Sequence, residues 1–438
     1  MNFKKICVLG LGYIGLPTAS TFATHGIEVI GVDVNSQILT ILKSGGLHIH
    51  EPGLRTIVEA ALKSGKLTVS ATPEEADAFL IAVPTPFYTD RSGEYNRETY
   101  KVADMRAVTS ATEAIVPYLR KGNLVVLEST SPPRTTIDLV QPILERSGLK
   151  AGKDFYLAYS PERVLPGQIL RELIENARVI GGVTPESAQA GADLYSIFVK
   201  GDILQTDATT AEMVKLMENT YRDVNIAIAN EFARLAERFG VNVWEAVALA
   251  NRHPRVKILS PGPGVGGHCI SVDPWFLVEA APDLTPLIYT ARKVNDEQPH
   301  YVMQLVQKAL GSLKGKHIAV LGLAYKADVD DLRESPAVEA VHLLLDAGAS
   351  VRAYEPYKVE GLPGIPMASS LAEALQDADA ILLLVRHTQF TKITPSEVAA
   401  MTSAHTIVDA VNAWGADSWK AAGFTVLRLG NGKSTTGA

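Results

Sequence analysis

Short runs of hydrophobic residues alternate along this chain with segments that have helical spacing. The runs KKICVLG, IEVIGVD, DAFLIAVP, NLVVLEST and DFYLAYS are apolar, and each ends in glycine, proline or polar residues. Such runs are typical of strands buried on both faces of a parallel sheet. The segments between them predict helices, so the first half of the chain is expected to form a doubly wound α/β sheet.

From Thr209 to Phe239 the pattern changes to one long amphipathic segment. Thr209 and Glu212 predict a capping box at its start, and Gly240 predicts its end. Apolar residues recur along it at helical spacing: Met213, Met217, Tyr221, Val224, Ile228, Phe232 and Leu235. We expect a helix of this length, placed between two α/β halves, to be a linker and dimerisation element.

The second half of the chain repeats the first. KHIAVLGLAYKA mirrors KKICVLGLGYIG, ASVRAYEPY mirrors IEVIGVDVN, DADAILLLV mirrors EADAFLIAV, and HTIVDAVN mirrors NLVVLEST. The predicted fold is therefore α/β, with two Rossmann-like parallel-sheet domains joined by a central helical domain with one long helix. The expected boundaries are residues 1–205, 206–305 and 306–438.

The first strand ends in a glycine turn that predicts a dinucleotide site. Gly10 allows the tight turn, Gly12 lets the backbone approach a pyrophosphate, and Gly15 lets helix and strand pack closely. Asp33 ends the next strand, where a carboxylate accepts from a ribose hydroxyl and repels a 2′-phosphate, so NAD is favoured over NADP. The turn contributes the following residues to the predicted cofactor site: Gly10, Gly12, Tyr13, Ile14 and Gly15.

The second copy of this turn differs from the first. It keeps Gly322 but carries Ala324 and Ala327 at the later glycine positions, and it places Lys326 inside the turn. A side chain in place of the second glycine hinders the approach of a pyrophosphate. The C-terminal lobe is therefore expected to hold a different phosphorylated ligand, such as a nucleotide-linked substrate.

Polar residues follow several predicted strands, where ligands of open α/β sheets gather. They are Pro84, Thr85, Glu128, Thr130 and Glu162. For each of them a turn or capping role is the alternative.

Composition narrows the class of protein. The chain has 438 residues and a net charge of −7, which argues against general nucleic-acid binding. Its two cysteines offer no disulfide framework, so a cytoplasmic location is expected. The N-terminal run could be misread as a signal peptide, but it fits a strand, turn and helix. No apolar run reaches the roughly 18–20 residues of a membrane span, so no membrane association is expected.

The stretch PGPGVGGHCISVDPW surrounds one cysteine, Cys269, with glycine and proline. Three interpretations remain open from the residues alone: a turn with a buried cysteine, an anion cradle, or a nucleophile beside backbone N–H groups. Cys7, in the middle of the first strand, is interpreted as a buried apolar residue.

Several motifs together resemble the UDP-glucose/GDP-mannose dehydrogenase family. They are GLGYIGLP, VPTP, EST, SPERV, EMVKLMENTYRDVNIAIANE, PGPGVGGHCISVDP and YKADVDDLRESP, and they span nearly the whole chain. The resemblance implies an NAD domain, a central dimerisation domain and a UDP-sugar domain. It implies a four-electron oxidation of the sugar C6 alcohol to a carboxylate in two NAD-dependent steps, without metal.

The resemblance also implies residue roles. Cys269 would form a thioester, Lys215 and Asn219 would stabilise oxyanion charge, Asp273 and Thr130 would orient water, and Glu162 would act in thioester hydrolysis. Arg255 would reach the substrate of the partner in a homodimer. Arg333 is expected to contact the cofactor, as are Pro84, Thr85 and Thr130. The expected substrate contacts are Arg163, Val164, Lys215, Asn219, Arg222, Arg255, Gly266, His268 and Lys326.

HIHEPGL, NRHPRV and GHCISVDPW resemble the branch of the family that uses UDP-N-acetyl-D-mannosamine. Val272 and Pro166 stand where enzymes acting on UDP-glucose tend to carry a Lys and a Glu, which favours an N-acetylated sugar. The alternatives are UDP-N-acetyl-D-glucosamine as substrate or, less favoured, a nucleotide-sugar epimerase or dehydratase with bound NAD. An epimerase would need a Tyr-x-x-x-Lys pair, which has no suitable place in the N-terminal sheet.

Overall fold

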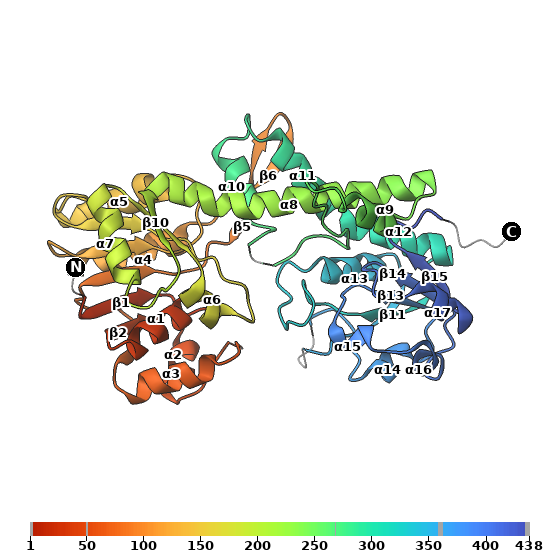
Figure 1. Ribbon diagram of the computed structural model, residues 1–438. Helices are drawn as coiled ribbons and strands as arrows, with labels where there is room; N and C mark the ends of the chain where they lie inside the picture. Colours follow the sequence, from red (N-terminus) through yellow and green to blue (C-terminus); the bar gives the residue numbers. More distant parts are fainter. Residues whose placement is uncertain (1–2, 50, 268, 358–361, 434–438) are drawn as a thin grey trace. The chain divides into compact units, whose positions relative to one another are not determined.

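The computed structural model describes residues 3–49, 51–267, 269–357 and 362–433. The chain divides into two compact units (Figure 1). The first comprises residues 1–218 and 275–284, and the second comprises residues 219–274 and 285–438.

The first unit is built on an eight-stranded sheet in the order β10-β9-β8-β7-β4-β1-β2-β3. The strands are β1 (Lys5–Leu9), β2 (Glu28–Val32), β3 (Leu67–Ser70), β4 (Ala78–Ile81), β7 (Leu124–Leu127), β8 (Tyr156–Tyr159), β9 (Arg178–Gly182) and β10 (Ile203–Asp207). They pair in parallel except for β8 and β9, which are antiparallel. The predicted parallel sheet is thus confirmed, and its last two strands run the other way.

Alternate residues of each strand enter opposite cores. In β1, Ile6 and Val8 join one buried cluster, and Cys7 and Leu9 join another. The first cluster lies under α1 (Gly15–Thr24), α3 (Leu54–Lys63), α6 (Ile169–Glu175) and α7 (Pro185–Tyr195). The second lies under α4 (Arg106–Ile115) and α5 (Gln141–Leu144). Because both faces are covered, the central strands β4 and β7 are apolar and buried at every position.

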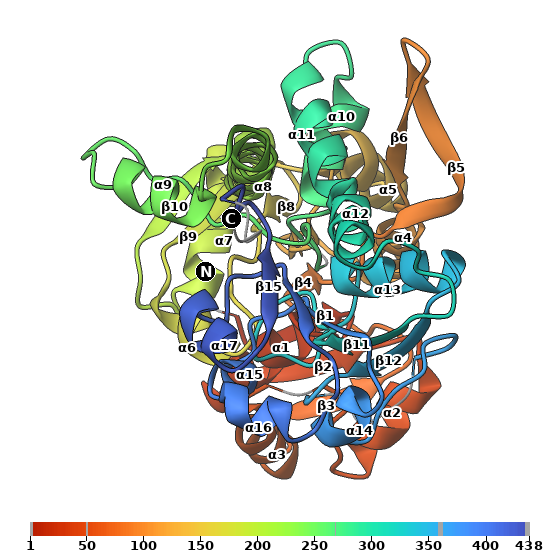
Figure 2. The same ribbon diagram turned by 90° about the vertical axis from the view of Figure 1, so that its right-hand side faces the viewer.

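A hairpin of β5 (Phe87–Tyr95) and β6 (Glu98–Ala103) extends beside α10 (Asp273–Ala280), as Figure 2 shows. The Phe87 ring packs edge-on against Phe276 with 5.8 Å between centroids. The Ala103 N–H donates to Glu279 at 2.8 Å.

The first unit also contains the helix α2 (Ser36–Lys43).

The second unit contains a five-stranded sheet in the order β12-β11-β13-β14-β15. The strands are β11 (His317–Leu321), β12 (Ser350–Tyr354), β13 (Ala380–Leu383), β14 (Thr406–Asp409) and β15 (Thr425–Arg428), all paired in parallel. Five neighbouring strands of the first unit follow the same order relative to the chain, namely β2-β1-β4-β7-β8. The predicted internal repeat is therefore confirmed. Its helices are α9 (Val243–Ala250), α11 (Pro286–Asp296), α12 (Gln298–Leu310), α13 (Pro336–Asp346), α14 (Leu371–Leu375), α15 (Thr388–Thr391), α16 (Pro395–Ala399) and α17 (Ala416–Ala421).

The long helix α8 spans Ala208–Phe239, and Gly240 follows with a φ of +71°. The predicted capping box is wrong. Asp207 accepts from the Thr210 N–H at 2.9 Å, while Glu212 is buried and accepts from the N–H groups of Arg134 and Thr136. The carboxylate predicted to cap its own helix instead holds the loop after β7. Among the described residues, no helix is long and apolar enough to cross a membrane.

Candidate active site

The glycine turn after β1 has the geometry that a dinucleotide requires. A Cβ on Gly10, whose φ is +94°, would lie 2.5 Å from the carbonyl oxygen of Ala82. A Cβ on Gly15 would lie 1.8 Å from the carbonyl oxygen of Gly10. Gly12 faces open space, with no atom within 4 Å of its Cβ position. The first and third glycines are therefore needed for packing, and the second leaves the room that a pyrophosphate would occupy.

Asp33 is fixed beside this turn. Its Oδ2 accepts from the Leu11 N–H at 2.9 Å and its Oδ1 from the Asn35 N–H at 2.8 Å. The side chain is partly exposed, and Val34 next to it is 95% exposed. A negative charge is thus held at the edge of the turn, where the ribose of a dinucleotide would lie.

The loops after β4 and β7 are tied to each other. The Thr85 hydroxyl donates to the Thr130 carbonyl at 2.7 Å, and the Ser129 hydroxyl donates to the Val83 carbonyl at 2.7 Å. Pro84 lies between these anchored residues. The structure therefore brings together the residues predicted at the carboxyl ends of these strands.

Glu162 follows β8 and is 9% exposed. Its Oε1 accepts from the Arg163 N–H at 2.6 Å and its Oε2 from Arg178 Nη1 at 3.2 Å. The Arg163 guanidinium binds Glu218 and, through Nη1, the Ala177 carbonyl at 3.1 Å. Arg163 is thus engaged within the protein, while Val164 packs at the rim of the core.

On α8 the predicted residues Lys215, Asn219 and Arg222 differ in their surroundings. Lys215 is 8% exposed, so this lysine is not a solvated surface residue. Asn219 donates through Nδ2 to Asp273 Oδ2 at 2.5 Å, and Asp273 is buried at the start of α10. Arg222 is exposed. Two of the residues predicted for the site, Asn219 and Asp273, are therefore joined by a direct hydrogen bond.

The glycines before Cys269 allow the loop to pack against residues 325–336. A Cβ on Gly266 would lie 2.4 Å from the Glu334 carbonyl oxygen, and a Cβ on Gly267 would lie 2.8 Å from the Tyr325 ring. The Gly267 N–H donates to the Arg333 carbonyl at 3.0 Å. His268 lies outside the described residues. The glycines thus serve close backbone approach.

Cys269 is partly buried and lies four residues before the first residue of α10. Its carbonyl accepts from the N–H groups of Val272 and Asp273 at 3.0 and 2.8 Å, which begins a helical turn. Burial raises the pKa of the other thiol, Cys7, to about 12. The two cysteines therefore have different environments, and Cys7 is unsuited to act as a thiolate.

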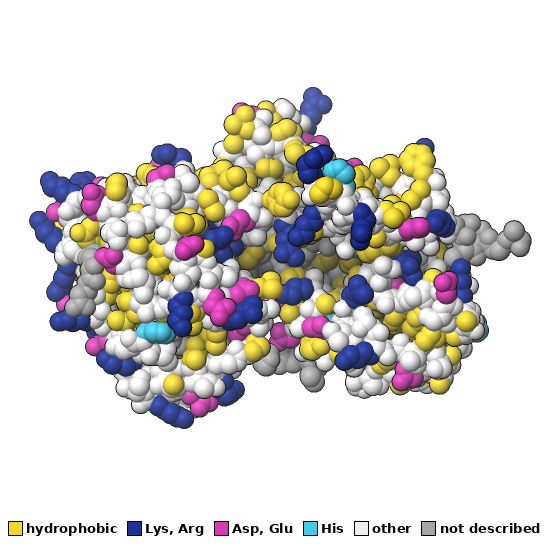
Figure 3. All heavy atoms as spheres, in the orientation of Figure 1, with side chains coloured by type: hydrophobic (Ala, Val, Ile, Leu, Met, Phe, Trp, Pro, Cys, Tyr) yellow, Lys and Arg dark blue, Asp and Glu magenta, His cyan; other side chains and the backbone are white. Residues whose placement is uncertain are grey.

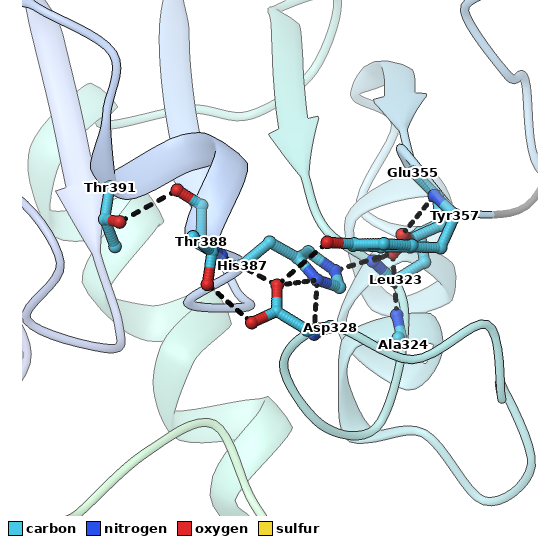
Figure 4. A network of polar contacts seen from close by, with 8 residues as sticks. All are labelled: Leu323, Ala324, Asp328, Glu355, Tyr357, His387, Thr388 and Thr391. Atoms are coloured by element: carbon cyan, nitrogen blue, oxygen red, sulfur yellow. Dashed lines mark hydrogen bonds and ion pairs between the residues drawn. The ribbon is translucent and has the colours of Figure 1, made fainter. Parts of the chain in front are cut away.

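In the C-terminal lobe, the acidic residue that corresponds to Asp33 is enclosed in a polar network (Figure 4). Glu355 Oε2 accepts from the N–H groups of Leu323 and Ala324 at 2.7 and 3.0 Å. Burial alone would raise the pKa of Glu355, but hydrogen bonds from His387 and from the backbone hold it below its ordinary value. This carboxylate is occupied by protein groups, and Ala324 is buried, unlike the open Gly12.

The same network anchors the segment that carries Lys326 and Arg333. His387 Nδ1 accepts from the Asp328 N–H at 2.9 Å, so its Nε2 carries the proton and donates to Glu355 at 3.1 Å. The Asp328 carboxylate accepts from the Thr388 N–H at 2.8 Å. Arg333 forms an ion pair with Asp331, with 2.6 Å between Nη2 and Oδ2. Arg255, in the loop after α9, is exposed.

Arg178 is a residue that the sequence analysis missed. It binds Glu162 and the neighbouring Glu128 inside the first unit. A signal was present, because an arginine within the apolar run RVIGG is unusual in a buried strand.

Among the described residues, no group of three His, Cys, Asp or Glu side chains could hold a metal ion.

Models of one family match three parts of the chain. They are the NAD binding domain of the UDP-glucose/GDP-mannose dehydrogenase family (residues 4–199), its central domain (residues 209–297) and its UDP binding domain (residues 319–416).

Individual proteins are similar over nearly the whole chain. A UDP-N-acetyl-D-mannosamine dehydrogenase of Methanococcus maripaludis is 47% identical, over 98% of each protein. An NDP-N-acetyl-D-galactosaminuronic acid dehydrogenase of Ralstonia nicotianae is 47% identical, over 95% of this chain and 97% of that protein. A solved UDP-D-ManNAc dehydrogenase from Pyrococcus horikoshii has a TM-score of 0.89 at 41% identity, covering 98% of this chain and 100% of its own.

Proposed function

Because this chain belongs to the UDP-glucose/GDP-mannose dehydrogenase family, we propose that it oxidises UDP-N-acetyl-D-mannosamine to UDP-N-acetyl-D-mannosaminuronate. NAD is the cofactor, which follows from the family's NAD binding domain. The observation that carries the proposal is the glycine-rich loop at Cys269, together with the hydrogen bond between Asn219 and Asp273. An epimerase needs neither feature.

When bound, NAD would supply the hydride acceptor for each of the two oxidation steps. The residues proposed for the chemistry are Thr130, Glu162, Lys215, Asn219, Cys269 and Asp273. The glycine turn and Asp33 hold the cofactor, with Pro84, Thr85 and Thr130 as further contacts. Lys326, Arg163 and Arg222 are proposed to bind the UDP-sugar.

Cys269 supplies the covalent step. After the first hydride leaves, the C6 alcohol is an aldehyde, and the Cys269 thiolate forms a C–S bond to its carbon. Loss of the second hydride gives a thioester, and water cleaves its C–S bond to release the carboxylate and the thiol. Overall, one alcohol, one water and two NAD give one carboxylate, two NADH and three protons.

The remaining side chains stabilise charge and transfer protons. Lys215 and Asn219 lie one helical turn apart on α8, and we propose that they stabilise the oxyanion that forms at C6. Asp273, which Asn219 orients, and Thr130 position water. Glu162 takes a proton from the water that attacks the thioester. We also infer that the reaction takes place in the cytoplasm and supplies surface-polysaccharide synthesis.

The choice of sugar is tested by direct competition. With NAD, the protein is expected to turn over UDP-N-acetyl-D-mannosamine with a higher kcat/KM than its gluco or galacto isomers, or than UDP-glucose. A site that hydrogen-bonds the acetamido group rejects the wrong isomer by about 10- to 1000-fold, because buried polar groups lose their partners. NADH release and acid formation are measured, and two NADH per acid are expected. A higher kcat/KM with a different isomer would contradict the sugar, and one NADH would contradict the mechanism.

Asp33 is expected to determine the preference for NAD over NADP. Asp33→Ala should narrow the ratio of kcat/KM for the two cofactors by about 10-fold or more, because the charge that repels a 2′-phosphate is lost. Asp154→Ala, which removes a carboxylate distant in sequence from the turn, is the control and should leave the ratio unchanged. Equal use of NAD and NADP by the unaltered protein would contradict the assignment.

We propose that the protein is a homodimer that pairs through α8. Apolar side chains along this helix are exposed, with Tyr221 at 69%, Phe232 at 40% and Leu235 at 48%. Hydrophobic side chains are visible along the course of α8 in the space-filling view (Figure 3). A stripe of this kind marks an interaction surface. The exposed Arg255 is proposed to reach the partner's substrate.

Subunit mixing tests this arrangement. Arg255→Ala and Cys269→Ala are each expected to be nearly inactive, but a randomly exchanged equal mixture should recover about a quarter of full activity. Half of the dimers are then mixed, and each mixed dimer has one complete site if Arg255 acts across a two-fold interface. Subunit exchange is verified with a mass-labelled chain. If the exchanged mixture recovers no activity, Arg255 and Cys269 of each active site belong to the same chain.

A further inference from the structure

Arg178 joins two carboxylates inside the first unit. Its side chain is 5% exposed, and Nη2 donates to Glu128 Oε1 at 2.8 Å while Nη1 donates to Glu162 Oε2 at 3.2 Å. Its Nε donates to the Ser160 hydroxyl at 2.8 Å. One buried cation therefore serves carboxylates that follow two neighbouring strands, β7 and β8.

Tyr195 of α7 completes this cluster. The Arg178 guanidinium lies 3.8 Å from the centre of the Tyr195 ring, and the Tyr195 hydroxyl donates to Glu128 Oε1 at 2.5 Å. Glu128 is fully buried, and its Oε2 has no hydrogen-bond partner among the described residues. Glu128 is thus remote from solvent, and its carboxylate accepts hydrogen bonds from Arg178 and Tyr195.

We propose that Glu128 is a positioning residue that controls the proton affinity of Glu162 through Arg178. The inference rests on the proposed function, because it concerns the step in which Glu162 takes a proton from water. An ionised Glu128 compensates the charge of Arg178, so Glu162 remains a good base. When Glu128 is protonated, it no longer compensates the positive charge of Arg178. The full charge of Arg178 then acts on Glu162 and makes Glu162 a weaker base.

The groups around Glu128 cause its carboxyl group to change charge near neutral pH. Burial raises the pKa of Glu128 to about 7, with Arg178 opposing and Glu162 adding to the shift. The hydrogen bond from Tyr195 lowers the pKa of Glu128. On the other side of Glu162, the Arg163 guanidinium is bound to Glu218 of α8, so its charge is compensated. The charge of Glu128 is therefore sensitive to the groups around Arg178.

The test is single-turnover formation of the acid, with protein in excess over UDP-N-acetyl-D-mannosamine and NAD saturating. Samples are quenched between pH 5.5 and 8.5, and both free acid and protein-bound acyl group are measured. In the unaltered protein, the hydrolysis rate should rise through an inflection near pH 7. In Glu128→Gln this inflection should vanish, and the rate above it should fall by about 3- to 10-fold. The KM for the sugar and the rate of NADH formation should stay within about twofold.

Tyr195→Phe provides an independent second variant. It keeps the ring and removes the hydroxyl that stabilises the Glu128 carboxylate, so the inflection should move up by about half a pH unit. Asp409→Asn is the control, because Asp409 is a buried carboxylate of the C-terminal lobe whose pKa burial also raises. This control should lower the melting temperature and leave the inflection in place.

The outcomes separate the two proposals. An inflection that persists in Glu128→Gln and does not move in Tyr195→Phe would overturn the role of Glu128 while the proposed function stands. If Glu128→Gln does not fold, the direction of the shift in Tyr195→Phe decides alone. Failure of the unaltered protein to form acid would instead overturn the proposed function.

Discussion

Cys269→Ala is expected to lower the rate of uronate formation by about 10,000-fold or more, because no other group takes over the covalent step. NAD should still bind with an unchanged Kd, since the glycine turn and Asp33 are untouched. Acid formation is followed by mass spectrometry, and NAD binding by calorimetry. Normal conversion to acid by this variant would exclude the thioester mechanism.

Cys7 offers a matched control for this prediction. Cys7→Ala makes the same substitution at a fully buried thiol in β1, where it removes a packed sulfur atom. Activity per folded molecule should be retained, while the free energy of unfolding falls by about 1 kcal/mol. Iodoacetamide should alkylate Cys269 in the folded protein and leave Cys7 unmodified, because burial raises the pKa of Cys7 to about 12.

Glu162→Gln is expected to slow acid formation by about 100- to 10,000-fold, the usual contribution of a general base. Both oxidation steps precede the use of Glu162, so the thioester should accumulate. Intact-mass measurement should then show the acyl group of the nucleotide sugar on Cys269. The amide retains an acceptor for Arg178 and the shape of the side chain, which limits the structural effect.

Glu113→Gln is the control for this second prediction. Glu113 forms an ion pair with Arg146 in which both side chains are substantially exposed, so its loss should change stability by less than about 1 kcal/mol. It should neither accumulate an adduct nor alter kcat. A Glu162→Gln variant that is slow but carries no adduct would place Glu162 before the thioester, in one of the oxidation steps.

The alternation of apolar runs and helical segments correctly predicted both sheets. Strands covered on both faces must be apolar at every position, and this property is visible without knowledge of the fold. The repeat of the four runs predicted a second Rossmann-like sheet, and the structure shows that the two sheets share a strand order. The strands β9 and β10 and their reversed direction were not predicted. The strand β10 is largely exposed, so it lacks the continuous apolar run that marks a strand buried on both faces.

Local patterns were weaker guides to individual side chains. Thr209 and Glu212 have the spacing of a capping box, yet Glu212 binds the loop after β7 and Asp207 caps the helix. Several apolar residues of α8 are exposed, although the same spacing would suit a helix that faces a core. Helical spacing predicts which residues share a face of the helix. Contacts with the rest of the protein determine what that face packs against.

The sequence by itself determined the fold class, the glycine turn with Asp33, and the position of Cys269 in a loop rich in glycine and proline. These features depend on backbone conformation and on residues close together in the chain. The tertiary structure alone decided that the loop glycines pack against residues 325–336, that Asn219 orients Asp273, and that Arg178 links Glu128 to Glu162. The contacts of Arg178 and Asn219 join residues between 16 and 54 positions apart. Their energies depend on burial and charge compensation, which arise when distant segments come together.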